Sequence, residues 1–130
     1  MQKVLVVVFI LLFISCQHDS PQPVLVNSVF QPYLDTFLAE GKKRGRDFQL
    51  DKEGITIKLA KLDPKYYGIA YRDTRTIEMD SLWLKTNDFV RQRMLFHELG
   101  HLLLKRDHIL SYLPNGEAKS LMWTPVNNLD

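Results

Sequence analysis

Cysteine is the scarcest residue type in this 130-residue chain, which contains only Cys16. A single cysteine cannot form an internal disulfide, so the fold has to be held by its core. A strong excess of one charge is also missing, because 17 basic and 15 acidic side chains leave a net charge of +2. That balance gives no support to nucleic-acid binding, which depends on many cationic contacts with phosphate. The length allows one domain.

Long apolar runs are also absent. The longest, at residues 4–14, has eleven residues, whereas a helix that spans a bilayer needs about 20. A short run behind Lys3 is typical of the apolar region of a signal peptide. It leads into residues 13–16 (FISC), which resemble a bacterial lipobox, in which the cysteine is diacylated and becomes the new N-terminus.

The lipobox resemblance predicts a lipoprotein signal peptide at residues 1–15, lipidation of Cys16 and a polar tether at residues 16–23. The protein would then be anchored in the bacterial cell envelope, with the outer membrane as the expected location. Each buried methylene of the acyl chains would contribute about 0.8 kcal/mol to anchoring. The alternative is an ordinary secretory signal in which the cysteine has no role.

Residues 24–130 are expected to form one α+β domain. Apolar residues at helical spacing predict an N-terminal helix that stops at Gly41. These residues are Phe30, Tyr33, Leu34, Phe37 and Leu38. Residues 55–59 alternate with a period of two and predict a strand, and residues 67–72 and 76–79 predict two more. We therefore expect a small mixed sheet of three to four strands, packed on the N-terminal helix and on a second helix.

The second helix carries the candidate chemistry. It is predicted to begin at Asp88, after a capping Asn87 or Thr86, and to run to about Leu104. It contains the segment FHELGH at residues 96–101, and three of the four histidines of the chain fall within twelve residues. This clustering of histidines favours a metal-binding site.

His97 and His101 are four residues apart, so on a helix they are offset by only about 40° and 6 Å. Both imidazoles can therefore reach one zinc ion at about 2.0–2.1 Å. Glu98 lies one step round the helix, from where it can take a proton from a water bound to the metal. A chance arrangement of polar residues is the alternative, but on so apolar a helix it would cost several kcal/mol without partners. The pattern predicts Zn²⁺.

A catalytic zinc site needs a third protein ligand, and Asp107 and His108 are the candidates after the helix. On a continuous helix His108 would lie about 16 Å from His97 along the axis. The chain must therefore turn back near residues 104–106.

Residues 97–108 (HELGHLLLKRDH) resemble the long zinc-binding consensus of metzincin metallopeptidases. In that family a glycine follows the second histidine by three residues, and a third ligand, His or Asp, follows three residues later. Here Leu104 stands at the glycine position and Asp107 at the third-ligand position, with His108 one residue beyond. A turn made without the glycine, and one residue longer, favours His108 as the third ligand. Asp107 is the alternative.

Residues 120–122 resemble the metzincin Met-turn, in which Met122 would pack beneath the metal without ligating it. Simple core packing is the other interpretation of this methionine. The tyrosine that often follows in the family is replaced by Thr124, so Tyr112 is considered for stabilising an oxyanion, and a core or surface tyrosine is the favoured alternative. The resemblance also places residues 76–79 at the edge strand that aligns substrate.

The resemblance covers roughly residues 66–126, and the chain is similar overall to small bacterial lipoproteins regarded as zinc metallopeptidases. It implies a minimal metzincin-like fold and hydrolysis of a peptide or protein substrate by a membrane-anchored monomer. Two other functions stay open. One is a non-catalytic lipoprotein whose metal braces the fold or binds a partner. The other is a gluzincin-like peptidase that takes Glu117 from a downstream helix, although residues 114–116 favour a turn there.

Overall fold

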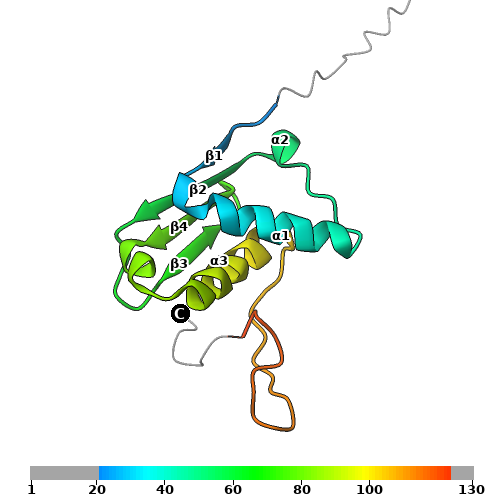
Figure 1. The fold of residues 1–130 in the computed structure, drawn as a ribbon, viewed down its shortest axis with the longest axis vertical. Helices are drawn as coiled ribbons and strands as arrows, with labels where there is room; N and C mark the ends of the chain where they lie inside the picture. The colour runs from blue at the N-terminus through cyan, green and yellow to red at the C-terminus, as the bar shows by residue number, and fades with distance from the viewer. Residues whose placement is uncertain (1–20, 124–130) are drawn as a thin grey trace, which may run out of the picture.

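The computed structural model describes residues 21–123. The predicted signal peptide and Cys16 lie outside the described residues. The described part is α+β, with one four-stranded mixed sheet and three α-helices (Figure 1). Its elements are β1 (Val24–Val26), α1 (Gln31–Lys43), α2 (Leu50–Glu53), β2 (Ile55–Ala60), β3 (Gly68–Tyr71), β4 (Thr76–Asp80) and α3 (Asp88–Leu103). None of the helices in this part is long and apolar enough to cross a membrane.

The strand order in the sheet is β1-β2-β4-β3. β2 pairs in parallel with both β1 and β4, whereas β3 pairs with β4 in antiparallel fashion. The prediction that residues 76–79 form an edge strand is therefore wrong. Ile77 and Met79 are fully buried, and β4 lies in the interior because β2 and β3 pair with its two sides. The edge strand on this side of the sheet is β3.

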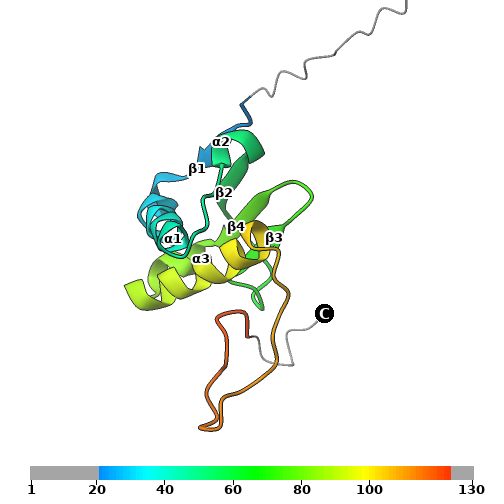
Figure 2. The same ribbon diagram turned by 90° about the vertical axis from the view of Figure 1, so that its right-hand side faces the viewer.

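The core lies between the sheet and the helices α1 and α3, which cover the same face side by side (Figure 2). The buried core residues are Phe30, Leu34, Phe37, Ile55, Ile57, Ile77, Met79, Trp83, Leu95, Leu99 and Leu102. The predicted α+β class and mixed sheet are confirmed. β1 and α2 were not predicted, since three or four residues are too few to show a period.

Gly41 does not end the first helix as predicted, because α1 continues to Lys43. A Cβ atom at Gly41 would lie 2.5 Å from Cε2 of Phe48, so this glycine allows close packing instead. The left-handed conformation that usually ends a helix is adopted by Gly45, at φ 76°.

The helix α3 begins at Asp88, as predicted, and Asn87 is its cap. The Val90 N–H donates to the Asn87 side chain at 2.9 Å, which satisfies one of the free donors at the helix start. Leu95, Leu99 and Leu102 attach one face of α3 to the core. The face that carries the histidines is thereby turned toward β3.

We predict that Leu95→Ala lowers the free energy of unfolding by about 2–5 kcal/mol, because it removes a fully buried side chain. Leu25→Ala on β1 makes the same chemical change at a side chain that is 60% exposed, and it should cost less than about 1 kcal/mol. Denaturant unfolding of the two variants measures the difference. Equal losses would contradict the core described here.

Candidate metal centre

Three histidines meet at one point beside α3. His97 and His101 come from the helix, and His108 comes from the loop that follows it. The Nε2 atoms of His97 and His101 are 3.0 Å apart, those of His101 and His108 are 3.0 Å apart, and those of His97 and His108 are 3.1 Å apart. These three imidazoles lie close enough to one another to bind a metal ion.

The hydrogen-bond partners of the two Nδ1 atoms determine the tautomers of His97 and His101. Nδ1 of His97 lies 2.8 Å from the Leu121 carbonyl, and Nδ1 of His101 lies 2.7 Å from the Arg106 carbonyl. A carbonyl oxygen can only accept, so each Nδ1 carries a proton and donates it. The Nε2 of each neutral ring is then a bare lone pair that faces the centre of the cluster. This is the usual arrangement of metal-binding histidines.

The donor set therefore fits a cation. Lone pairs that face one another at 3.0 Å repel, and a metal ion between them would replace the repulsion with bonds. Tetrahedral nitrogens at about 2.0–2.1 Å from zinc would be separated by about 3.3–3.4 Å, slightly more than in the cluster. Small outward movements of the rings would make up the difference. Imidazole ligands suit zinc, copper, iron and nickel.

Burial favours the neutral imidazoles that a metal requires. It is the main cause that lowers the pKa of His97 and of His101, and the positive charge of neighbouring groups lowers both further. The bonds to the Leu121 and Arg106 carbonyls act in the opposite direction. A lowered pKa means that fewer protons compete with a metal near neutral pH.

The chain returns to the helix through a turn that uses no glycine. Leu104 keeps a helical φ of −97°, and Lys105 then adopts a left-handed φ of 53°, which costs roughly 1–2 kcal/mol for a residue with a side chain. The Arg106 N–H donates to the Gly100 carbonyl at 3.2 Å. The left-handed residue, Lys105, thus comes one position after Leu104, which stands where the metzincin consensus has glycine.

This turn brings His108, rather than Asp107, to the histidine pair. The Asp107 side chain is 86% exposed and pairs with Arg72, with 2.8 Å between Oδ1 and Nη2. His108 Nε2 is within 3.1 Å of both helical histidines. Of the two third-ligand candidates, only His108 has its donor atom in the cluster.

Met122 packs against the same helix at Gly100. Its side chain is buried, and its sulfur would lie 2.5 Å from a Cβ atom at Gly100, so the glycine between Leu99 and His101 allows this approach. The Met122 carbonyl accepts from the Ile109 N–H at 2.9 Å. Met122 therefore supports the helix on one side and the loop that carries His108 on the other.

Glu98 is buried between α3 and β3, with 9% of its surface exposed. The Ala70 backbone N–H donates to its carboxylate. A Cβ atom at Gly68 would lie 2.9 Å from Cγ of Glu98, so this glycine makes room for the side chain. Burial raises the pKa of Glu98 to about 7, and the bond from Ala70 opposes the rise. A cation held by the histidines would lower the pKa again.

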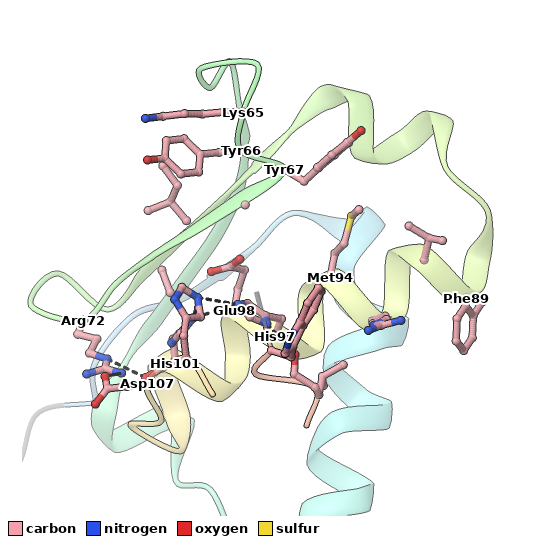
Figure 3. Close-up of a pocket in the computed structure, with 18 residues that line it drawn as sticks. Lys65, Tyr66, Tyr67, Arg72, Phe89, Met94, His97, Glu98, His101 and Asp107 are labelled. Atoms are coloured by element: carbon pink, nitrogen blue, oxygen red, sulfur yellow. Dashed lines mark hydrogen bonds and ion pairs between the residues drawn. The ribbon is translucent and has the colours of Figure 1, made fainter. Parts of the chain in front are cut away.

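The histidines and Glu98 share a cleft of about 730 Å³ between β3 and α3. Figure 3 shows Arg72 and Asp107 at one end of this cleft and Phe89 at the other, with His97, Glu98 and His101 between them. The cleft residues Gly68, Ala70 and Arg72 belong to no motif in the sequence. Their contacts join segments that are far apart in sequence, so no local pattern marks them.

Tyr112 and Glu117 do not line this cleft. The Tyr112 side chain is 56% exposed, and its ring packs against Trp123 at 5.6 Å between centroids. Its predicted contact with an oxyanion has no counterpart here. Glu117 is exposed and follows the turn at residues 114–116. The helix that a gluzincin-like ligand would need is therefore missing from this part of the described chain.

Comparison of the chain with protein-family models, with curated proteins and with solved structures gives no match.

Zinc affinity should distinguish the two candidates for the third ligand, His108 and Asp107. We predict that His108→Ala lowers zinc affinity at least about tenfold, because it removes one of three donors. Asp107→Ala removes an exposed carboxylate outside the cluster, and an exposed ion pair contributes little, so it should change the affinity less. Chelator competition measures both values. A larger loss in Asp107→Ala than in His108→Ala would contradict the assignment.

Proposed function

We propose that this protein is a zinc-dependent, metzincin-like peptidase of the bacterial cell envelope, anchored through Cys16. His97, His101 and His108 would hold the metal, and Glu98 would be the general base. The observation that carries the proposal is the combination of three converging imidazoles with a buried carboxylate in one open cleft.

His97, His101 and His108 would hold the zinc ion through neutral imidazoles, and the ion would supply a Lewis acid for a peptide carbonyl and for a water molecule, whose pKa it would lower to about 7. A Glu98 carboxylate oxygen accepts the proton of the attacking water and then delivers it to the leaving amide nitrogen. Ala70 orients this carboxylate through its N–H, and Gly68 leaves it room. Burial raises the pKa of Glu98 above that of a free glutamate and so favours acceptance of a proton, while a bound cation would act in the opposite direction.

The edge strand β3 supports a peptide as substrate. The Asp80 N–H donates to the Tyr67 carbonyl at 2.9 Å, so Tyr67 and Asp80 form a hydrogen-bonded pair. Along an antiparallel ladder such pairs alternate with pairs that are not hydrogen-bonded, and Gly68 and Ala70 belong to the second kind. The backbone groups of Gly68 and Ala70 therefore point away from β4, and both residues line the cleft. The Ala70 N–H donates to Glu98, so a peptide would pair with the backbone groups of Gly68 and with the Ala70 carbonyl. An extended peptide can pair with such an edge. The aligning role that was expected for residues 76–79 is thus proposed for β3.

The alternative of a purely structural metal is less well supported. Structural zinc sites are normally closed by four protein ligands, whereas three histidines gather here at an open cleft. A structural site also has no need of Glu98, whose burial is costly. These two features favour catalysis.

Glu98→Gln should lower peptide hydrolysis about 10²–10⁴-fold while zinc content stays unchanged, because it removes the general base and no ligand. The measurement uses a soluble chain that begins at Gln17, loaded with zinc and supplied with a mixture of peptides. Glu117→Gln is the matched control, since it makes the same change at an exposed glutamate, and it should retain full activity.

Two outcomes would refute the peptidase proposal. One is undiminished hydrolysis in Glu98→Gln. The other is a parent protein that binds zinc and hydrolyses no peptide. A loss of both bound zinc and activity in Glu117→Gln would instead favour the gluzincin-like alternative, in which Glu117 is a metal ligand.

A further inference from the structure

Arg72 follows β3 and contacts the loop that returns from α3. Its Nε donates to the His101 carbonyl at 3.1 Å. Its Nη2 donates to the Arg106 carbonyl at 2.5 Å and to Oδ1 of Asp107 at 2.8 Å. One guanidinium thus contacts both the last turn of the helix and the loop beyond it (Figure 3).

These contacts act on the metal centre through the backbone. The Arg106 carbonyl that accepts from Arg72 also accepts from Nδ1 of His101, at 2.7 Å. The position of this carbonyl determines both the rotation of the His101 ring and its tautomer. Arg72 therefore helps to orient Nε2 of His101, which faces the cluster, without contacting this nitrogen itself.

The same contacts hold the turn that carries His108. Lys105 adopts a left-handed conformation, with φ 53°, in which glycine is favoured. Arg72 bonds to the residues on both sides of Lys105, namely His101 before it and Arg106 and Asp107 after it. A planar fork of N–H donors suits this set of acceptors.

We propose that Arg72 is the positioning residue of the metal centre, a clamp on residues 101–107 that orients His101 and returns His108 to the histidine pair. The Asp107 carboxylate contributes by accepting a hydrogen bond from Arg72. Arg72 would position the three histidines in this way whether the bound metal is catalytic or structural.

The test compares Arg72→Ala with Arg44→Ala. Arg44 also donates to a backbone carbonyl and to a carboxylate, both of Glu40, but on α1. We expect Arg72→Ala to lower Zn²⁺ affinity about 10–100-fold and to change the visible spectrum of the Co²⁺-substituted protein. Arg44→Ala should leave both unchanged. Chelator competition and Co²⁺ titration supply the readouts, neither of which depends on hydrolysis.

Arg72→Lys keeps the charge and most of the stem, but a single ammonium cannot match the fork of donors. We expect it to recover part of the affinity, and its Co²⁺ spectrum decides the question if the alanine variant does not fold. Parental affinity and a parental Co²⁺ spectrum in either Arg72 variant would overturn the proposal.

A separate observation concerns the charges that line the cleft. Arg72 and Asp107 pair with each other, and Glu98 is buried. Lys65 and Arg93 remain, both positive, and neither forms an ion pair within the described residues. Arg93 lies on α3 one turn before His97, and Lys65 precedes β3 on the other wall. A bound divalent cation would add to this positive field.

We infer that the cleft selects peptides with acidic side chains, an inference that rests on the proposed peptidase function. Complementary charge raises the local concentration of an anionic ligand and weakens in salt. Lys65 and Arg93 would contact the acidic groups, while the metal and Glu98 act on the peptide bond.

Zinc-loaded Glu98→Gln protein permits binding to be measured without turnover. Fluorescence polarisation compares two labelled peptides that differ only in Glu against Gln. We expect the Glu peptide to bind at least about fivefold more tightly, with the difference reduced by salt and lost in Lys65→Gln/Arg93→Gln. Lys43→Gln on α1 is the control. Equal binding of both peptides, or no binding of either, would overturn this inference, whereas the hydrolysis assay decides the peptidase proposal separately.

Discussion

The candidate metal centre depends on one turn, the reversal of the chain at Lys105. Two histidines on a helix share one side by geometry alone, but a third ligand eleven residues from the first can join them only if the helix ends and the chain returns. The return is held by Arg72, by the Gly100 carbonyl and by the bond between Ile109 and Met122. Three segments of the fold thus combine to place one imidazole, His108.

Close approach of side chains to two glycines makes the rest of the site compact. Gly68 lets β3 pass directly over Glu98, and Gly100 lets Met122 pass directly against α3. The buried leucines on the opposite face of α3 hold the helix to the sheet. As a result, a carboxylate and three imidazoles lie in one cleft, partly withdrawn from water, where electrostatic interactions are stronger than in solvent.

The sequence predicted those features that depend on local spacing. The start of α3, a cap at Asn87 or Thr86, of which the structure has Asn87, and the convergence of His97 and His101 follow from helical geometry and capping chemistry. The order of the strands could not be predicted, because the pairing of β4 with β2 joins distant segments. The contacts of Arg72 with residues 101–107 were missed for the same reason. The need for a third ligand indicated Asp107 or His108, and the resemblance favoured His108, but no periodicity describes the loop that follows the left-handed Lys105.

The central claim is that three imidazoles bind one zinc ion here, and X-ray absorption at the zinc edge tests it most directly. The measurement uses the protein loaded with one equivalent of Zn²⁺. We predict a shell of three imidazole nitrogens from His97, His101 and His108 at about 2.0–2.1 Å, with the remaining position filled by oxygen. The nitrogen shell should shrink to two in His108→Ala. A spectrum with two imidazoles in the parent, or an unchanged shell in that variant, would contradict the account.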